Sequence, residues 1–104
     1  MGKATGFIEV FGLAAAFVAV DAGCKAADVT VETLDKNKPG NADALPVPLI
    51  VCIKFRGTVD NVKAAVEAAE AAAKGVTGVI STHIIANTEE STEKMLRINA
   101  FDKN

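Results

Sequence analysis

Apolar and polar residues alternate in the first part of the chain. In the segment Thr5–Val10, the residues Gly6, Ile8 and Val10 fall on one side, and Phe7 and Glu9 fall on the other. This alternation predicts a half-buried strand, because successive side chains of a strand point to opposite faces. The segment Leu49–Arg56 shows a different pattern. It is apolar at nearly every position except Lys54 and Arg56, which is typical of an inner strand. The four predicted strands are Thr5–Val10, Val29–Leu34, Leu49–Arg56 and Val79–Ile85.

Apolar residues spaced three and four positions apart predict two helices between these strands. The first begins at Leu13 and ends near Ala27 and Asp28, and the second follows Thr58, a residue that can cap a helix, and stops at Gly75. The predicted apolar face of the first helix holds Leu13, Phe17, Val20 and Cys24. That of the second holds Val59, Val62, Val66, Ala69, Ala73 and Val76.

The order of these elements, βαββαβ, indicates the fold class. Right-handed crossovers place both helices on one face of a four-stranded antiparallel sheet, which is a ferredoxin-like α/β (α+β) arrangement. We predict one domain over residues 1–88. Residues 89–104 form a polar C-terminal tail in which Lys94–Phe101 can make a short helix that packs back or frays.

The segment between the second and third predicted strands is expected to be a loop. It holds all three prolines, a Pro-Gly pair and several residues that favour turns. Over residues 36–48 its lysines and aspartates do not give a strong charge of one sign. The residues of interest are Lys36, Asn37, Lys38, Pro39, Gly40, Asp43, Leu45, Pro46, Val47 and Pro48.

Composition indicates how the chain behaves in solution. Half of its 104 residues are hydrophobic, mostly Ala, Val and Ile, yet no apolar run approaches the roughly 20 residues that span a bilayer. A subunit this apolar is expected to cover part of its surface in contacts between copies. The net charge of −2 predicts neither nucleic-acid binding nor attraction to an anionic membrane.

Residue types that carry catalysis are sparse, so we predict that the chain is not an enzyme. The single histidine, His83, lies in a predicted strand and is expected to have a structural role. Cys24 and Cys52 are far apart and sit in apolar patterns, which predicts buried thiols in a reducing cytoplasm rather than a disulfide or zinc site. No glycine-rich phosphate loop precedes a helix.

Four short segments along the chain form a characteristic set. They are the passage from a Glu-bearing strand into an Ala-rich helix, the end of that helix, the Arg-Gly passage into the second helix, and the last strand. In this chain they are residues 4–16, 21–29, 55–65 and Thr82-His83-Ile84-Ile85. Together and in this order they resemble the bacterial microcompartment shell proteins, and the resemblance covers about residues 4–87.

This resemblance implies a cyclic homo-hexamer that tiles into a shell around encapsulated enzymes, with a pore on its sixfold axis. The partners would be neighbouring shell proteins and the enclosed enzymes, and the location a microcompartment within the cytoplasm. Lys25, four residues after Asp21, matches a lysine that the family uses at the hexamer edge. Where the family has a Pro-Arg-Pro-His-like segment, this chain has Ala86-Asn87-Thr88-Glu89, so the edge contact near Asn87 must differ.

The loop over residues 36–48 is longer than in typical members and resembles a branch associated with glycyl-radical enzymes. Some members of that branch carry a Pro-x-Cys-Pro string whose cysteine holds an iron–sulfur cluster at the pore. Val47 stands at the position of that cysteine and cannot ligate iron, so we expect no cofactor and no metal. We expect a pore lined by backbone and by small or apolar side chains.

Two other functions fit the same order of elements. One is a regulatory domain of ferredoxin-like fold in which the loop over residues 36–48 closes over a small molecule. The other is a redox or iron–sulfur shell subunit that uses Cys24 or Cys52. Regulators of the first kind are commonly dimers or trimers, and a subunit of the second kind would absorb visible light.

Overall fold

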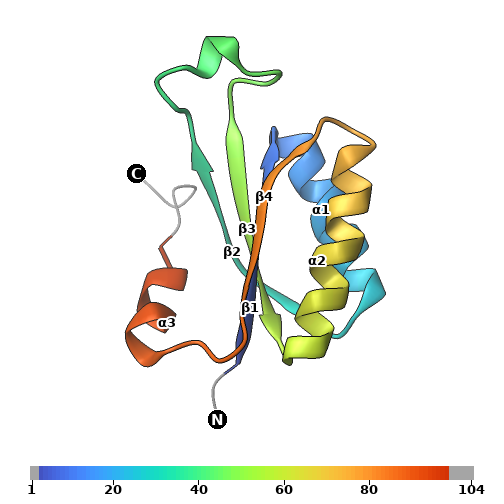
Figure 1. Ribbon diagram of the computed structural model, residues 1–104, viewed down its shortest axis with the longest axis vertical. Coiled ribbons are helices and arrows are strands. Elements are labelled where there is room, and N and C mark those ends of the chain that lie inside the picture. Colours follow the sequence, from blue (N-terminus) through green and yellow to red (C-terminus); the bar gives the residue numbers. More distant parts are fainter. Residues whose placement is uncertain (1–2, 99–104) are drawn as a thin grey trace.

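The computed structural model describes residues 3–98 and contains all four predicted strands and both predicted helices (Figure 1). A short 3-10 turn and a third helix complete the order of elements. The strands are β1 (Ala4–Phe11), β2 (Thr30–Asn37), β3 (Ile50–Gly57) and β4 (Val79–Ile85). The helices are α1 (Leu13–Ala26), α2 (Val59–Lys74) and α3 (Glu90–Leu96), and the 3-10 turn η1 is Ala42–Ala44.

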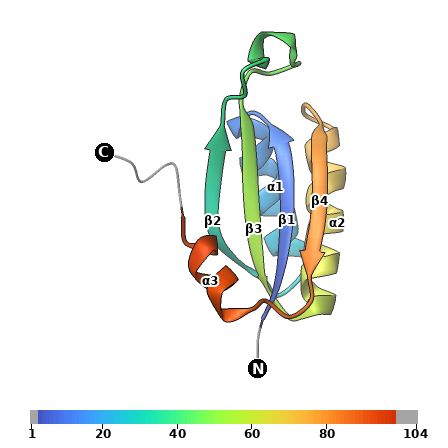
Figure 2. The same ribbon diagram turned by 60° about the vertical axis from the view of Figure 1, so that its left-hand side comes forward.

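The strands form one antiparallel sheet in the order β2-β3-β1-β4, so the predicted ferredoxin-like arrangement is confirmed. Helices α1 and α2 pack against one face of this sheet, and α3 lies on the other (Figure 2). The central strands β1 and β3 are in register from Ala4 opposite Gly57 to Phe11 opposite Ile50. The first and third strands of the chain thus form the middle of the sheet.

Two boundaries differ by several residues from those predicted. Strand β2 continues to Asn37, so Lys36 and Asn37 are not loop residues: they pair with Val51 and Ile50 of β3. The sequence of Asp35, Lys36 and Asn37 shows no alternation of apolar and polar residues, because all three are polar. An edge strand exposed to solvent tolerates such residues. The third helix starts at Glu90 rather than Lys94, because Glu89 caps it by accepting a hydrogen bond from the Ser91 amide. Of the predicted Lys94–Phe101 helix, residues 99–101 lie outside the described residues.

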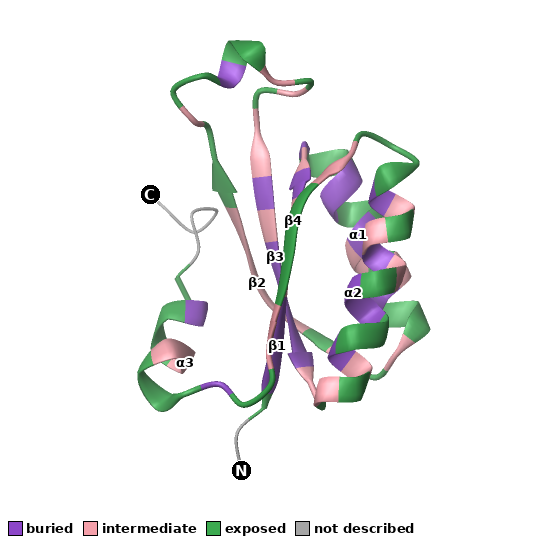
Figure 3. Cartoon of the chain, in the orientation of Figure 1, coloured by how far each residue is buried: buried purple, intermediate pink, exposed green. Residues whose placement is uncertain are grey.

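The core lies between the sheet and the helix pair, where buried residues face each other from β1, β3, α1 and α2 (Figure 3). Alternation explains the strand contribution: Ile8 and Val10 of β1 are fully buried while Phe7 and Glu9 on the opposite face are only partly so, as predicted. The predicted stripe of α2 is largely confirmed, with Val62, Ala65, Val66, Ala69 and Ala73 buried; Val59 is only partly buried and Val76 is exposed.

The predicted apolar face of α1 is wrong. Leu13, Phe17 and Cys24 are exposed and Val20 is only partly buried, whereas the buried face consists of small residues. These are Ala15, Ala16, Ala19 and Gly23. The reason is the close approach of α1 to its neighbours: a Cβ atom at Gly23 would lie 2.6 Å from Cζ of Phe55 and 3.1 Å from the carbonyl oxygen of Ala65 in α2. Only small side chains fit at that distance.

Candidate functional site

The loop between β2 and β3 projects from one end of the molecule's long axis (Figure 1). It is ordered by local hydrogen bonds around η1, in which the amides of Ala42, Ala44 and Leu45 donate to the carbonyls of Pro39, Asn41 and Ala42 at 2.9–3.1 Å. Lys38, Gly40 and Asp43 are exposed, as are Pro46 and Pro48; Pro39, Leu45 and Val47 are partly buried. The loop is therefore a compact projection with its polar residues outward.

Val47 turns inward toward the first strand-to-helix connection. A Cβ atom at Gly12 would lie 3.2 Å from Cγ1 of Val47, so this side chain covers the Gly12 backbone. The Gly12 amide also donates to the carbonyl of Leu49 at 2.8 Å, which ties the base of the loop to the start of α1. An apolar side chain packed in this way offers no ligand, so the residues present do not fit an iron–sulfur cluster. Within residues 3–98 no group of three or more His, Cys, Asp or Glu side chains could hold a metal ion.

The residues predicted for the hexamer edge lie away from this loop. Helix α1 runs from the loop end toward the opposite end of the sheet, where the β4–α3 connection also lies (Figure 1). Near the end of α1, Lys25 Nζ is 2.7 Å from Asp21 Oδ2, and both side chains are well exposed. Asn87 is exposed in the β4–α3 connection. The structure thus separates the predicted edge residues from the predicted pore loop along the long axis.

The two cysteines are less buried than the sequence predicts, and the histidine lies at the surface. Cys24 is exposed, and Cys52 is half-buried on the sheet face opposite α1 and α2. Burial, followed by the nearby Glu9 carboxylate, raises the pKa of Cys52 to about 11. Its thiol is therefore protonated at neutral pH, which makes it a poor nucleophile or metal ligand. His83 is exposed and lies opposite Phe7 in the pairing of β4 with β1, so it is not packed in a core.

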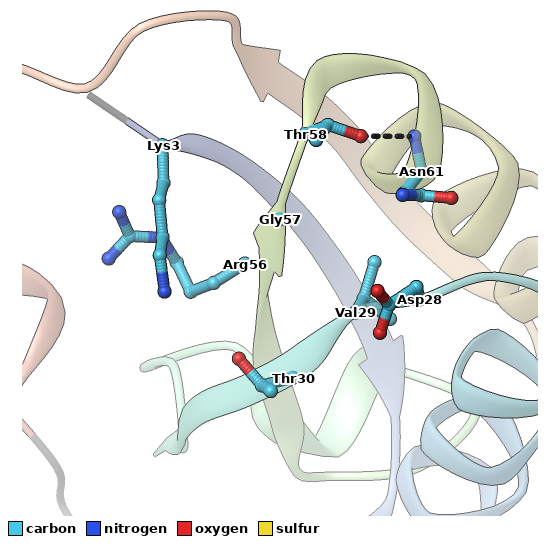
Figure 4. Close-up of a pocket in the computed structure, with 8 residues that line it drawn as sticks. All are labelled: Lys3, Asp28, Val29, Thr30, Arg56, Gly57, Thr58 and Asn61. Carbon is cyan, nitrogen blue, oxygen red and sulfur yellow. Dashed lines mark hydrogen bonds between the residues drawn. The ribbon is translucent and has the colours of Figure 1, made fainter. Parts of the chain in front are cut away.

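A hollow of about 340 Å³ lies at the end of the sheet opposite the loop (Figure 4). It is flanked by the start of α2, where the Thr58 hydroxyl accepts a hydrogen bond from the Asn61 amide at 3.3 Å and caps the helix as predicted. Lys3 and Arg56 lie on its far side (Figure 4). The loop over residues 38–49 projects from the other end and does not close over this hollow.

One polar cluster was not predicted from the sequence. Lys54 and Arg56 of β3 are buried on the sheet face that carries α3, and they contact Glu93 and backbone carbonyls of the C-terminal segment. The signal was present as two cations at alternate positions of an otherwise apolar inner strand, together with acidic residues after the last strand. Inner-strand cations need partners because an unpaired buried charge is very costly.

None of the helices within residues 3–98 is long and apolar enough to cross a membrane.

The chain is similar to known proteins over nearly its whole length. The family model described as the BMC domain matches residues 4–88. The chain is 36% identical over 94 residues to the bacterial microcompartment shell protein PduA of Citrobacter freundii, covering 90% of this chain and 91% of that protein. It is 40% identical over 100 residues to the carboxysome shell protein CcmK2 of Thermosynechococcus vestitus, covering 94% of this chain and 89% of that protein.

A solved structure has the same fold. It is a microcompartment protein from Desulfitobacterium hafniense, with a TM-score of 0.71 and 23% identity. The match covers 93% of this chain but only 48% of the longer solved chain, so this chain spans about half of its length.

These similarities confirm the predicted resemblance, the shell role and the place in a bacterial microcompartment, whereas the glycyl-radical branch stays a prediction. The chain belongs to the BMC-domain family of bacterial microcompartment shell proteins.

Proposed function

We propose that this shell protein forms cyclic homo-hexamers that tile side by side, enclose the enzymes of the compartment and leave a central pore, without catalysing a reaction itself. The observation that carries the proposal is the match of the BMC domain to residues 4–88, together with shell-protein relatives that cover about nine-tenths of the chain. Hexamers and pores are typical of this family.

The surface supports assembly from many copies. Large apolar side chains remain exposed on α1, among them Phe17 at 60%, with Leu13 and Val18 beside it. Ile80 on the edge strand β4 is also exposed. Apolar surface of this kind is unfavourable in water and becomes favourable when another subunit covers it. This is the behaviour expected of a subunit that is stable as part of a ring.

The loop between β2 and β3 is the proposed pore lining. Its exposed Lys38, Gly40 and Asp43 would each occur six times around the axis, which places equal numbers of these positive and negative charges at the opening. Lys36 and Asn37, at the end of β2, would stand behind them. With Val47 packed on Gly12, the pore would carry no metal cluster. The size and polarity of a metabolite would then decide whether it passes through the pore.

The opposite end is the proposed edge where neighbouring hexamers meet. Lys25 is exposed there with its ammonium held by Asp21, and Asn87 is exposed on the β4–α3 connection. A lysine suits such a contact because its apolar stem lies across a neighbouring surface while its ammonium donates to carbonyls. The Asp21–Lys25 pair itself contributes little to the fold, since exposed helix pairs are worth about 0.3–0.5 kcal/mol.

Reversing the charge of Lys25 tests this arrangement. Lys25→Asp should leave hexamers intact by light scattering while sheets and tubes disappear in electron micrographs. Lys63→Asp, which reverses the charge of an exposed lysine on α2, is the matched control and should still form extended assemblies.

Three results would contradict the proposal. Sheets that persist in Lys25→Asp would remove Lys25 from the edge. A wild-type chain that runs as a dimer or trimer would remove the hexamer and favour the regulatory domain. Visible absorbance after anaerobic purification would favour the iron–sulfur or redox subunit.

A further inference from the structure

The inner strand β3 places two cations on the sheet face away from α1 and α2. Val51, Ile53 and Phe55 are buried against the helix pair, so the alternate residues Lys54 and Arg56 must face the other way. They are nevertheless only 7% and 5% exposed. What covers and neutralises them is chiefly the C-terminal segment.

Arg56 binds α3 through Glu93. Its Nη1 donates to Glu93 Oε1 at 2.8 Å and its Nη2 donates to Glu93 Oε2, which makes a two-pronged pair. Nη1 also donates to Glu32 Oε1 at 3.0 Å, and Nε donates to the Ala4 carbonyl at 3.3 Å. The guanidinium is therefore fixed by β1 and β2, and its fork points at one side chain of α3.

Lys54 binds the far end of the same segment. Its Nζ donates to the Leu96 carbonyl at 3.3 Å and to the Ile98 carbonyl at 2.9 Å. The Thr33 hydroxyl of β2 donates to the Leu96 carbonyl as well, at 2.8 Å. Carbonyls at the end of a helix lack partners within the helix, and a cation there also complements the helix dipole.

Apolar contact adds comparatively little to this attachment. Of the seven residues of α3, only Leu96 is buried, while Met95 is 65% exposed. A helix of seven residues is not stable on its own, because nucleation costs more than so few hydrogen bonds return. Order in α3 therefore depends on its contacts with the sheet, which include hydrogen bonds from Arg56, Lys54 and Thr33.

We propose that residues 89–98, which include α3, form a movable segment, the strap. The Arg56–Glu93 pair, the latch, holds this strap on the sheet. The strap begins beyond Thr88, which is held in place because its hydroxyl lies 2.7 Å from that of the buried Thr5 and its amide donates to the Lys3 carbonyl. Residues 89–98 can therefore leave the sheet without disturbing β4 or the helix pair. Loss of the latch releases them as a unit.

Release of the strap would change the surface of the subunit. Met95, Leu96 and Ile98 form one wall of a hollow of about 260 Å³, and Phe7 and Lys54 line the sheet side. With the strap in place the hollow is lined by both apolar and charged side chains. With the strap released, the same strands present an open face with the aromatic ring of Phe7, a Lys54 that has lost its carbonyl partners on the strap, and an Arg56 that keeps only Glu32 and the Ala4 carbonyl. The latch thereby decides which of two faces this side of the shell subunit presents.

Limited proteolysis tests the latch, because the strap carries its own trypsin sites at Lys94 and Arg97, which are exposed but held in or beside a helix. Glu93→Gln keeps the shape of the side chain and removes its charge. Cleavage after Lys94 and Arg97 should become about tenfold faster than in the wild type, since the ion pair is lost and glutamine offers one acceptor oxygen to the Arg56 fork in place of two. The matched control is Glu90→Gln, an exposed glutamate on the same helix, which should leave the rate unchanged.

Hydrogen exchange on the assembled protein provides the second measurement. In Glu93→Gln, amides of residues 89–98 should exchange faster while those of β1 and β3 keep their protection. Equal cleavage and exchange in the Glu93→Gln and Glu90→Gln variants would overturn the proposal. So would a uniform loss of protection over the whole chain, because the pair would then hold the entire fold rather than a strap.

Discussion

The two faces of the sheet are built on different chemistry, although both use the same strands. On the α1–α2 face, contact is close and apolar, and glycine and alanine let the backbones approach. On the α3 face, contact is made chiefly by two cations, one glutamate and backbone carbonyls, and Leu96 is the one buried apolar residue of α3. The first face depends on shape and cannot open without unfolding. The second depends on a few polar bonds that can be broken one at a time.

Alternation along β3 produces this difference. Phe55 fills the space beside Gly23 on one face, and its neighbours Lys54 and Arg56 hold the strap on the other. In a packed interior, one added or removed methyl group already changes the free energy of unfolding. At a polar contact, the free energy changes when one of the hydrogen-bonding partners is removed. Substitutions on the two faces should therefore differ in size and in how far their effects spread.

The largest effect is expected where α1 approaches β3. Gly23→Ala adds a methyl group 2.6 Å from Cζ of Phe55, so the helix must shift. We expect a loss of about 1–3 kcal/mol in the free energy of unfolding, from denaturant titration, despite alanine's better helix propensity. Gly40→Ala in the loop is the control, because nothing lies within 4 Å of the added methyl group. Equal stability of the two variants would contradict the close packing.

A smaller effect is expected at the base of the strap. Thr88→Val leaves the buried Thr5 hydroxyl without its partner at 2.7 Å and should lower the free energy of unfolding by about 1–2 kcal/mol. The double variant Thr5→Val, Thr88→Val removes both hydroxyls and should recover most of the loss, because neither partner is then left unsatisfied. Thermal or denaturant unfolding of the three variants measures this. Additive losses would show that the two hydroxyls act independently.

The smallest effect is the response of the strap to acid. The hydrogen bonds that Glu93 accepts from Arg56, together with the charge of that guanidinium, lower the pKa of Glu93. Because the pKa of Glu93 is lower in the folded protein, its ionised carboxylate stabilises the attachment fully at pH values above the ordinary glutamate pKa of about 4.3. This stabilisation is lost as the pH falls through the lower pKa of the folded state. The strap should therefore stay attached at pH 5 to 7 and loosen only in stronger acid.

Nuclear magnetic resonance titration of the Glu93 carboxyl carbon follows this directly. In Arg56→Met, the pKa of Glu93 should return toward the ordinary range because its partner is gone. An unchanged pKa in that variant would mean that Arg56 is not its cause.

Strands and helices were predictable because each leaves a local pattern. Strand β4 was predicted to the residue, since Gly75 and Gly78 mark where α2 stops and an apolar segment follows. Thr58 marks the start of α2 in the same local way. The end of β2 was missed by three residues because Asp35, Lys36 and Asn37 look like loop residues, although their backbones pair with β3.

The contacts between elements were less predictable. The predicted buried face of α1 was centred on large apolar residues such as Phe17. The buried face instead holds Gly23 and alanines, because little space is left between α1 and Phe55. The spacing of apolar residues along one helix does not indicate how closely that helix approaches its neighbours. Likewise, Arg56 and Glu93 meet across 37 positions of sequence. Their pairing follows from the path of the chain after β4, which no local pattern specifies.

The central position of β1 has a consequence for synthesis of the chain. This strand is synthesised before the other three, yet its two neighbours in the sheet are β3 and β4, so its hydrogen-bonding edges stay unfilled until residues as distant as Ile85 have been made. Contacts so far apart in sequence form slowly, and an unpaired strand edge invites association with other chains. On the ribosome, the nascent subunit therefore passes through a stage in which β1 is complete but its edges are unpaired, and the time needed to translate the segments up to β3 and β4 sets how long that stage lasts.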